Sequence, residues 1–206
     1  MKRSNNLLEQ LKPSPYFTKE AVVQLSSQYA LKPTAVNTFI ARSLKRKNIL
    51  PLKRGFYVTA EFYNKNKNDS SYSFFLANVL RKPSYVSSWT ALQYYGLATE
   101  GIRTITSITP KVTRSYNAKI GSFSYASISE TLFDGFVLQK GTFDFYIATP
   151  AKALFDMLYF KTHRFQGIAF KQIPNLLEEV RVDIDAMDTR EQKKFYALIR
   201  NHIRHG

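Results

Sequence analysis

Residues 32–58 have the sequence KPTAVNTFIARSLKRKNILPLKRGFYV, and the expected fold of the N-terminal part of the chain depends on this stretch. From Pro33 onward, apolar residues recur at helical spacing, which predicts a helix that packs on one face. Proline suits a first helical turn, because its missing N–H has no intrahelical partner there and its φ is already helical. The residues expected to face inward are Val36, Phe39, Ile40 and Leu44.

A basic hairpin is expected after this helix. The helical pattern runs into a cluster of cations and is stopped by residues 49–51, ILP. Residues 52–58, LKRGFYV, then place Gly55 at a turn with β-prone aromatic residues after it. Lys53 and Arg54 would therefore lie at the tip of a small wing.

Two shorter helices are expected before residue 32. Residues 5–11 suit a first helix, which the two prolines within residues 12–15 would end. Thr18 is a typical N-cap for a second helix that begins at residue 19. The residues expected to face inward from these two helices are Leu7, Leu8, Leu11, Val22, Leu25 and Tyr29.

Residues 29–32 form a short connection between the second helix and the helix that starts at Pro33. This is the spacing of a helix-turn-helix, in which the later helix enters the major groove of DNA. Together with the basic hairpin, it predicts a winged helix-turn-helix over residues 1–60.

The outward face of the helix from Pro33 carries residue types that contact DNA. Asn37 can pair bidentately with adenine, Thr34 or Thr38 can contact a thymine methyl group or a phosphate, and arginine and lysine neutralise phosphates. The alternative interpretation is the solvated face of a helix in a basic protein. The candidate DNA-binding residues are Thr34, Asn37, Thr38, Arg42, Lys45, Arg46, Lys53 and Arg54.

The charge of the chain favours an anionic partner, and nucleic acid is the first candidate for it. The 206 residues carry a formal net charge of +15. Residues 1–70 hold 13 Lys/Arg against 4 Asp/Glu, which gives +9, and residues 71–206 hold 17 against 11, which gives +6. A second basic group flanks the expected strands and faces either DNA or another anionic partner. It consists of Arg103, Lys111, Arg114 and Lys119.

Composition excludes several classes of site. The chain has no cysteine, which rules out disulfides, thiolate metal sites and cysteine nucleophiles. No apolar run approaches the length of a membrane span, and residues 1–3 are followed by polar residues rather than a signal sequence. A cytoplasmic protein without a membrane partner is expected.

Residues 61–71 are polar, lack apolar periodicity and are predicted to be a linker between two domains. Residues 72–206 are expected to form an α/β domain with a mixed sheet and C-terminal helices, so the fold class of the whole chain is α+β. Thr149 and Pro150 mark the start of one deeply packed helix. Helices are expected at 72–81, 88–97, 150–161, 173–180 and 188–202, and extended segments at 85–87, 104–109, 119–125, 136–138 and 143–148.

The carboxylates offer the alternative of a metal-dependent nuclease. Asp183 or Asp185, with Glu191 and Lys193, has the residue types that hold Mg²⁺ and activate water. Glu191 and Lys193 are two residues apart on an expected helix and diverge by about 200°, which favours a solvated helix face. The remaining acids and histidines are too dispersed to predict a catalytic set, and no cofactor is expected. They are Asp134, Asp144, Asp156, His163, His202 and His205.

The aromatic residues Trp89, Tyr94 and Tyr95 allow two interpretations. They could stack bases or bind a protein, or they could belong to the core of the second domain. Their helical spacing favours the core.

Five stretches of the chain, in this order, resemble the antitoxins of AbiE-type, or type IV, toxin–antitoxin systems of bacteria. They are LKRGFYV at 52–58, PSYVSSWTALQYYGL at 83–97, ITSIT at 105–109, GSFSY at 121–125 and IATPAKALFD at 147–156.

This resemblance implies an N-terminal winged helix-turn-helix that represses its own operon by binding inverted repeats in double-stranded operator DNA. It also implies a C-terminal domain, without enzymatic activity, that counteracts a nucleotidyltransferase-like toxin encoded next door, with no need for a stable complex, and a role in phage resistance. One departure is Ala151, where the resemblance implies an acidic residue that would cap the helix or carry part of the antitoxicity, although Thr149 still supplies a cap. A general DNA-binding transcriptional regulator is the alternative.

Overall fold

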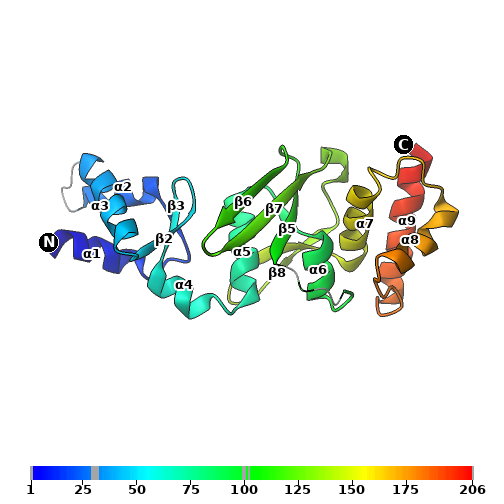
Figure 1. The fold of residues 1–206 in the computed structure, drawn as a ribbon, viewed down its shortest axis with the longest axis horizontal. Helices are drawn as coiled ribbons and strands as arrows, with labels where there is room; N and C mark the ends of the chain where they lie inside the picture. The colour runs from blue at the N-terminus through cyan, green and yellow to red at the C-terminus, as the bar shows by residue number, and fades with distance from the viewer. Residues whose placement is uncertain (1, 29–32, 99–100, 102, 206) are drawn as a thin grey trace. The chain divides into compact units, whose positions relative to one another are not determined.

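The computed structural model describes residues 2–28, 33–98, 101 and 103–205 (Figure 1). Both helices and strands are present in quantity, so the α+β class expected from the sequence is confirmed. Contacts divide the chain into two compact units. The first is Met1–Tyr72 with Tyr116–Gly121, and the second is Ser73–Ser115 with Ser122–Gly206.

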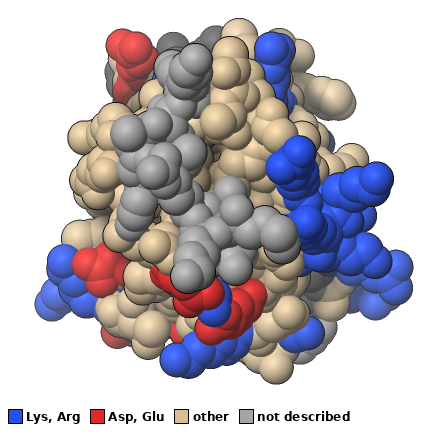
Figure 2. Space-filling model, turned by 90° about the vertical axis from the view of Figure 1, so that its left-hand side faces the viewer, with Lys and Arg blue, Asp and Glu red and all other residues tan. Residues whose placement is uncertain are grey.

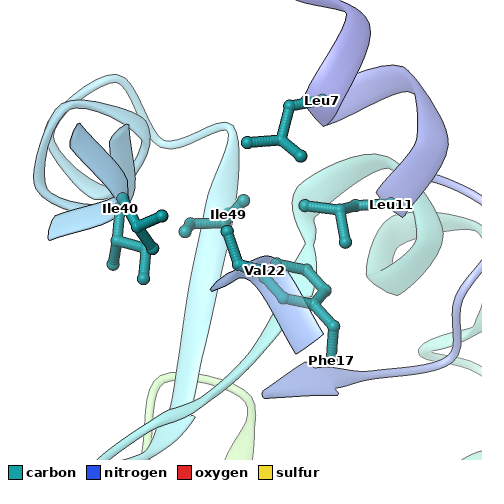
Figure 3. Close-up of a cluster of buried hydrophobic side chains, with 7 residues drawn as sticks. Leu7, Leu11, Phe17, Val22, Ile40 and Ile49 are labelled. Carbon is teal, nitrogen blue, oxygen red and sulfur yellow. The ribbon is translucent and has the colours of Figure 1, made fainter. Parts of the chain in front are cut away.

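The first unit packs three helices against a small antiparallel sheet. The helices are α1 (Lys2–Leu11), α2 (Lys19–Ser27) and α3 (Pro33–Lys45). The strands, in their order across the sheet, are β1 (Phe17–Thr18), β3 (Phe56–Thr59) and β2 (Ile49–Lys53). The buried core comes from every one of these helices and from β1 and β2 (Figure 3), and it consists of Leu7, Leu11, Phe17, Val22, Val36, Ile40 and Ile49.

Helices α2 and α3 begin at the residues that the sequence predicts. The hydroxyl of Thr18 accepts a hydrogen bond from the N–H of Ala21 at 3.2 Å, and α3 begins at Pro33. The expected connection at residues 29–32, and with it the inward position of Tyr29, lies outside the described residues.

One expectation about the first unit is incomplete and another is wrong. Helix α3 ends at Lys45, so the helix stops before residues 49–51 as predicted, but these residues also belong to β2, which lies at an edge of the sheet where a proline is tolerated. Residues 61–71 are not an irregular linker, because α4 (Ala60–Asn66) crosses them and α5 (Ser70–Leu80) begins within them. Thr59 caps α4 by accepting from the N–H of Phe62, whose ring packs 5.5 Å from that of Tyr72.

The larger sheet, which is built mainly from the second unit, is mixed, as the sequence predicts. Its strands have the order β6-β7-β5-β4-β9-β8. Strand β5 runs parallel to β7 and antiparallel to β4, and β4 runs parallel to β9. The strands are β4 (Tyr85–Val86), β5 (Thr104–Thr109), β6 (Arg114–Ala118), β7 (Gly121–Ser127), β8 (Phe136–Gln139) and β9 (Phe145–Ala148). The helical elements after α5 are α6 (Ser88–Tyr94), η1 (Glu130–Leu132), α7 (Pro150–Lys161), η2 (Phe170–Gln172), α8 (Ile173–Glu179) and α9 (Thr189–His205).

One strand was not expected. Residues 119–125 are not a single strand, because Lys119 and Ile120 form the turn between β6 and β7. Strand β6 consists of the residues RSYNA, which are exposed or only partly buried and so lack an alternation of apolar and polar residues.

Helix α7 is buried along almost its whole length because it packs between α6 and α9. It starts as the sequence predicts: the hydroxyl of Thr149 accepts from the N–H of Lys152 at 3.4 Å, and Pro150 occupies the first position. Within the described residues, none of the helices has the length and apolar character needed to cross a membrane.

Candidate nucleic-acid interface

The outward face of α3 is a polar stripe at the surface of the first unit. Val36 and Ile40 lie one turn apart on the same face and turn into the core, which leaves the opposite face of the helix in solvent. Seven of the eight candidate DNA-binding residues are exposed. They are Thr34, Asn37, Thr38, Arg42, Lys45, Arg46 and Arg54.

Four cations on and beside this stripe form no ion pair within the described part of the chain. They are Arg42, Lys45, Arg46 and Arg54. By contrast, Lys12 in the same unit lies 3.0 Å from carboxylate oxygens of both Glu9 and Glu61. Figure 2 shows this end of the chain, where lysine and arginine side chains gather along one side. Such a surface attracts phosphates.

The hairpin of β2 and β3 occupies the residues that the sequence predicts as a wing, and we refer to this hairpin as the wing. Gly55 turns the chain with a φ of +82°, a conformation that favours glycine, and its carbonyl accepts from the N–H of Lys19 at 2.9 Å. Lys53 is partly buried, with its ammonium group 4.0 Å from the centre of the Phe56 ring. Arg54 is therefore the wing cation that reaches furthest into solvent.

A groove of about 550 Å³ lies between α3 and the wing. Asn37 and Ala41 line it from α3, and Arg54 lines it from the hairpin. An amide and a guanidinium therefore share one concavity, and these are groups that can hydrogen-bond a base edge and a phosphate.

Two further residues that line the groove were not among the candidates identified from the sequence. Lys19 and Glu20 line the groove from the start of α2, which the pairing of β1 with β3 brings beside the wing. The Glu20 backbone N–H and the Thr18 hydroxyl hold the pKa of this carboxyl below its usual value, so it is ionised and can accept from a cytosine amino group. No local pattern signals this position, because it results from contacts between separate segments.

The second basic group does not form one cluster within a single unit. Arg103, Lys111 and Arg114 belong to the second unit, whereas Lys119 lies in the turn that is counted with the first unit. All four side chains are exposed.

The acids considered for a nuclease serve separate structural roles. Asp183 accepts hydrogen bonds from the N–H groups of Asp185 and Ala186 in a turn. Glu191 accepts from the N–H of Ala151 at 3.0 Å and pairs with Lys194 at 2.6 Å. Lys193 is exposed.

Glu191 supplies the acid that the sequence of α7 lacks. Its contact with the N–H of Ala151 places a carboxylate at the first turn of α7, where the helix dipole favours negative charge. Burial acts to raise the pKa of Glu191, but the hydrogen bonds from Lys194 and Ala151 outweigh burial and lower it. Helix α9 thus supplies the carboxylate at a helix start where the sequence has Ala151.

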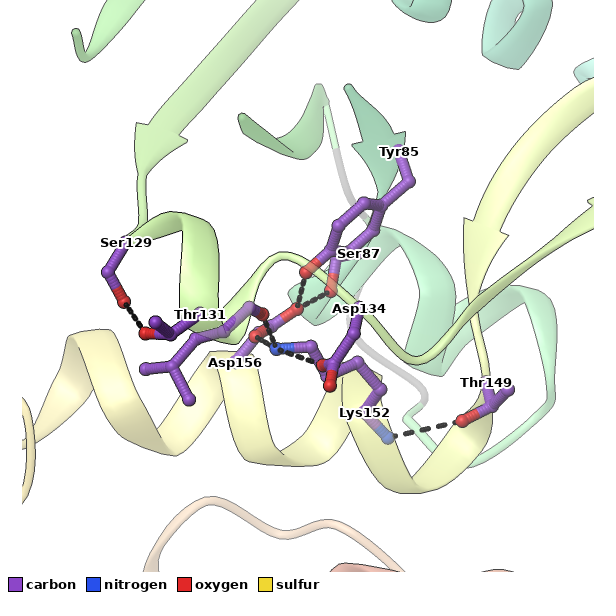
Figure 4. A network of polar contacts seen from close by, with 9 residues as sticks. Tyr85, Ser87, Ser129, Thr131, Asp134, Thr149, Lys152 and Asp156 are labelled. Carbon is purple, nitrogen blue, oxygen red and sulfur yellow. Dashed lines mark hydrogen bonds and ion pairs between the residues drawn. The ribbon is translucent and has the colours of Figure 1, made fainter. Parts of the chain in front are cut away.

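A buried polar network surrounds Asp156 in the second unit (Figure 4). Asp156 and Lys152 are 0% and 1% exposed, and the ammonium group donates to the carboxylate at 2.8 Å. Ser87 and Tyr85 donate to the other oxygen of Asp156 at 2.7 and 3.1 Å. The Lys152 ammonium group also donates to the carbonyl of Leu132 at 2.7 Å. Burial raises the pKa of Asp156, and these donors oppose that effect.

The network also explains why Ser87 does not cap α6. Its hydroxyl makes no capping hydrogen bond and is directed to Asp156 instead. Asp134 lies 3.9 Å from the Lys152 ammonium group but is 66% exposed. Asp144, on the hairpin between β8 and β9, pairs with Lys140 at 2.8 Å.

The histidines are dispersed among the described residues. His163 is exposed, and the ring of His202 packs against Phe155, Tyr159 and Phe165. The side chain of His205 lies outside the described residues. Within the described part of the chain, no group of three or more histidines and carboxylates is close enough to hold a metal ion.

Tyr94, the last residue of α6, and Tyr95, which follows it, pack within the second unit. The hydroxyl of Tyr95 donates to the carbonyl of Ala148 at 3.0 Å, and burial raises the pKa of Tyr95 to about 12. The ring of Tyr94 packs edge to face against Phe74 and Phe145 at 5.9 Å, although 41% of this residue stays exposed.

No protein-family model matches this chain, and no curated protein matches it. Four of the five stretches quoted from the sequence meet in one sheet and its covering helices, because β7, which contains 121–125, pairs with β5. Thr106 donates to the carbonyl of Ser87 at 2.6 Å, and the Ser87 hydroxyl donates to Asp156. These residues come from 105–109, 83–97 and 147–156, so these three stretches share a packing role.

Proposed function

We propose that the first unit is a winged helix-turn-helix that binds double-stranded DNA, with α3 in the major groove and the hairpin of β2 and β3 as its wing. The observation that carries this proposal is the exposed stripe of α3, whose cations have no acidic partner among the described residues. In this arrangement Asn37 reads a base edge, and Arg42, Lys45 and Arg54 contact phosphates or guanine.

The physiological target is the DNA upstream of the protein's own gene, and the protein acts there as an autorepressor. The test compares this DNA with a scrambled duplex of equal length over a range of salt concentrations. A preference of about a thousandfold or more supports an operator-binding repressor. Equal binding with a steep salt dependence for both duplexes would instead indicate a general nucleic-acid surface.

Base reading is tested with two substitutions on α3. Asn37→Ala and Arg42→Ala each weaken operator binding by about 1–3 kcal/mol and alter the base preference at one position. Lys65→Ala on α4, also an exposed cation of this unit, is the matched control and leaves the preference unchanged. Loss of affinity without any change of base preference would count against a reading helix.

The second unit is proposed to counteract a nucleotidyltransferase-like toxin encoded next door. The resemblance of residues 83–97 and 147–156 to AbiE-type antitoxins supports this assignment. Co-expression with that neighbouring protein tests it through colony growth. If antitoxicity resides in the second unit, the Asn37→Ala chain restores growth to the same extent as the unaltered chain. Loss of rescue by Asn37→Ala would instead mean that antitoxicity depends on DNA binding.

A further inference from the structure

A cavity of about 630 Å³ in the second unit has no role in the functions proposed above. It lies between α5, the residues before β4, and the strands β8 and β9. Its volume is within the range of small-molecule sites, which are mostly apolar with a few polar groups that orient the ligand. Four aromatic residues dominate its wall: Phe75, Phe133, Phe136 and Tyr146.

The aromatic wall is held in place from behind. Phe136 stacks on Tyr85 with ring centres 4.6 Å apart and an angle of 17° between the rings. Tyr146 packs edge to face against Phe136 at 5.7 Å, yet 44% of it is exposed. The wall therefore offers flat π surfaces that are fixed before a ligand arrives.

One buried polar group of this cavity is unsatisfied. Ser84 is 6% exposed, and its hydroxyl has no hydrogen-bond partner among the described residues. The neighbouring amide of Asn78 is occupied, because it accepts from the N–H of Tyr146 at 2.6 Å and donates to the carbonyl of Ser84 at 3.3 Å. A buried hydroxyl without a partner is costly unless a ligand atom completes its hydrogen bonds.

The rim of the cavity carries a positive charge without a partner. Lys82 is exposed and forms no ion pair within the described part of the chain. Asp144 also lines the cavity, but its carboxylate is paired with Lys140 at 2.8 Å. Lys82 is thus available to an anionic group at the mouth.

We propose that this cavity binds a nucleotide. The base packs among the aromatic rings, a heteroatom on its edge bonds to the Ser84 hydroxyl, and the phosphate lies at Lys82. An alkyl chain would leave both the Ser84 hydroxyl and the Lys82 ammonium group without a partner. A nucleotide instead stacks its base on the aromatic rings, hydrogen-bonds to the hydroxyl and places its phosphate at the ammonium group. Free mononucleotides and the nucleotides of an unpaired strand share this chemistry.

The test uses the full chain and saturation-transfer NMR with AMP, UMP, adenosine, uridine and a short single-stranded oligonucleotide. Binding of the mononucleotides with a Kd of about 1 mM or tighter is expected. Tighter binding of the oligonucleotide, lost through the same substitutions, assigns the site to a nucleic-acid strand. Equal or weaker oligonucleotide binding assigns the site to free nucleotides.

Three substitutions locate the ligand. Ser84→Ala and Tyr146→Ala each weaken nucleotide and nucleoside binding about tenfold, through loss of a hydrogen bond and of a stacking surface. Lys82→Ala weakens nucleotide binding about threefold and leaves nucleoside binding unchanged, because only nucleotides carry the phosphate. Ser84→Ala is expected to fold, since its hydroxyl has no partner in the described structure.

The matched control is Ser107→Ala. Ser107 is also buried, and its hydroxyl has no hydrogen-bond partner among the described residues. It does not line the cavity, so its loss leaves binding unchanged. Absence of binding to all four small ligands would overturn the proposal. It would equally be overturned if Arg42→Ala, rather than Ser84→Ala and Tyr146→Ala, abolished binding, because the ligand would then lie on the basic face of α3.

Discussion

Helices α3 and α7 both begin with a proline, yet their lysines have opposite surroundings. Lys45 on α3 is exposed and has no acidic partner among the described residues. Lys152 on α7 is 1% exposed and donates to Asp156 and to the carbonyl of Leu132. The comparison teaches that the packing of the helix, not the residue type, determines whether a lysine is available to an anionic partner.

The energetic reason is the cost of desolvation. An exposed cation is solvated by water and loses little when it has no ion-pair partner. A buried cation has lost that water, and its hydrogen-bonding partners in the protein take the place of the water. Removal of such a partner therefore lowers the free energy of unfolding strongly. Substitutions on the two helices should therefore differ in what they change: stability for α7 and binding for α3.

The largest expected effect is on the buried pair. Asp156→Ala leaves the Lys152 charge buried without its carboxylate and lowers the free energy of unfolding by about 3–5 kcal/mol. Replacing both residues by apolar ones costs less than this single change. Urea denaturation measures both variants. Asp144→Ala, which breaks the exposed pair with Lys140, is the control and leaves stability almost unchanged; equal effects of the two single substitutions would refute the comparison.

The core of the first unit gives the next effect. Leu7 is fully buried, and Leu7→Ala should lower the free energy of unfolding of this unit by about 2–5 kcal/mol. The buried residues that cluster with Leu7 all belong to the first unit. The substitution should therefore destabilise the first unit and weaken DNA binding, while the unfolding temperature of the second unit stays the same. Calorimetry that showed both transitions shifting together would contradict this separation.

A smaller effect is expected where α9 caps α7. Glu191→Gln removes the charge at the N–H of Ala151 and should cost about 1 kcal/mol. Because the folded-state pKa of Glu191 is lowered from 4.5, its stabilisation is fully present above pH 4.5 and is lost as the pH falls through the folded-state pKa. Urea denaturation across this pH range should show that the free energies of unfolding of the unaltered chain and of Glu191→Gln become equal in acid. A difference that persisted unchanged at low pH would exclude the charge as its cause.

The smallest effect is on the salt dependence of DNA binding. Arg54→Ala should reduce the slope of log K against log salt by about one, because one phosphate contact is lost. Lys53→Ala should reduce it less, since this ammonium group lies on the Phe56 ring. Filter binding at several salt concentrations measures both slopes, and a larger change for Lys53→Ala would reverse the roles given to the two wing cations.

Several elements could be predicted because their signals lie within a few residues. Thr18 and Thr149 cap the helices that they precede, and α3 begins at Pro33. Strand β5 occupies the predicted residues, and β8 and β9 fall on the extended segments predicted at 136–138 and 143–148. The DNA-binding role of the α3 residues stays a prediction.

Other elements could not be predicted because they depend on a partner. Strand β1 has only two residues and exists through its pairing with β3. Helix α4 lies in a polar segment, and the cap at Thr59 and the contact of Phe62 with Tyr72 hold it in place. The exposed β6 is defined by its place beside β7 in the sheet.

The sequence by itself determined where the helices start and which face of α3 is polar, because caps, prolines and apolar spacing act over one or two turns. Only the tertiary structure decided which charges are free and which are buried. Ser87 and Asp156 are 69 positions apart, and Ala151 and Glu191 are 40 positions apart, yet each pair forms a hydrogen bond. Such partners are chosen by the packing of distant segments, which no local pattern encodes.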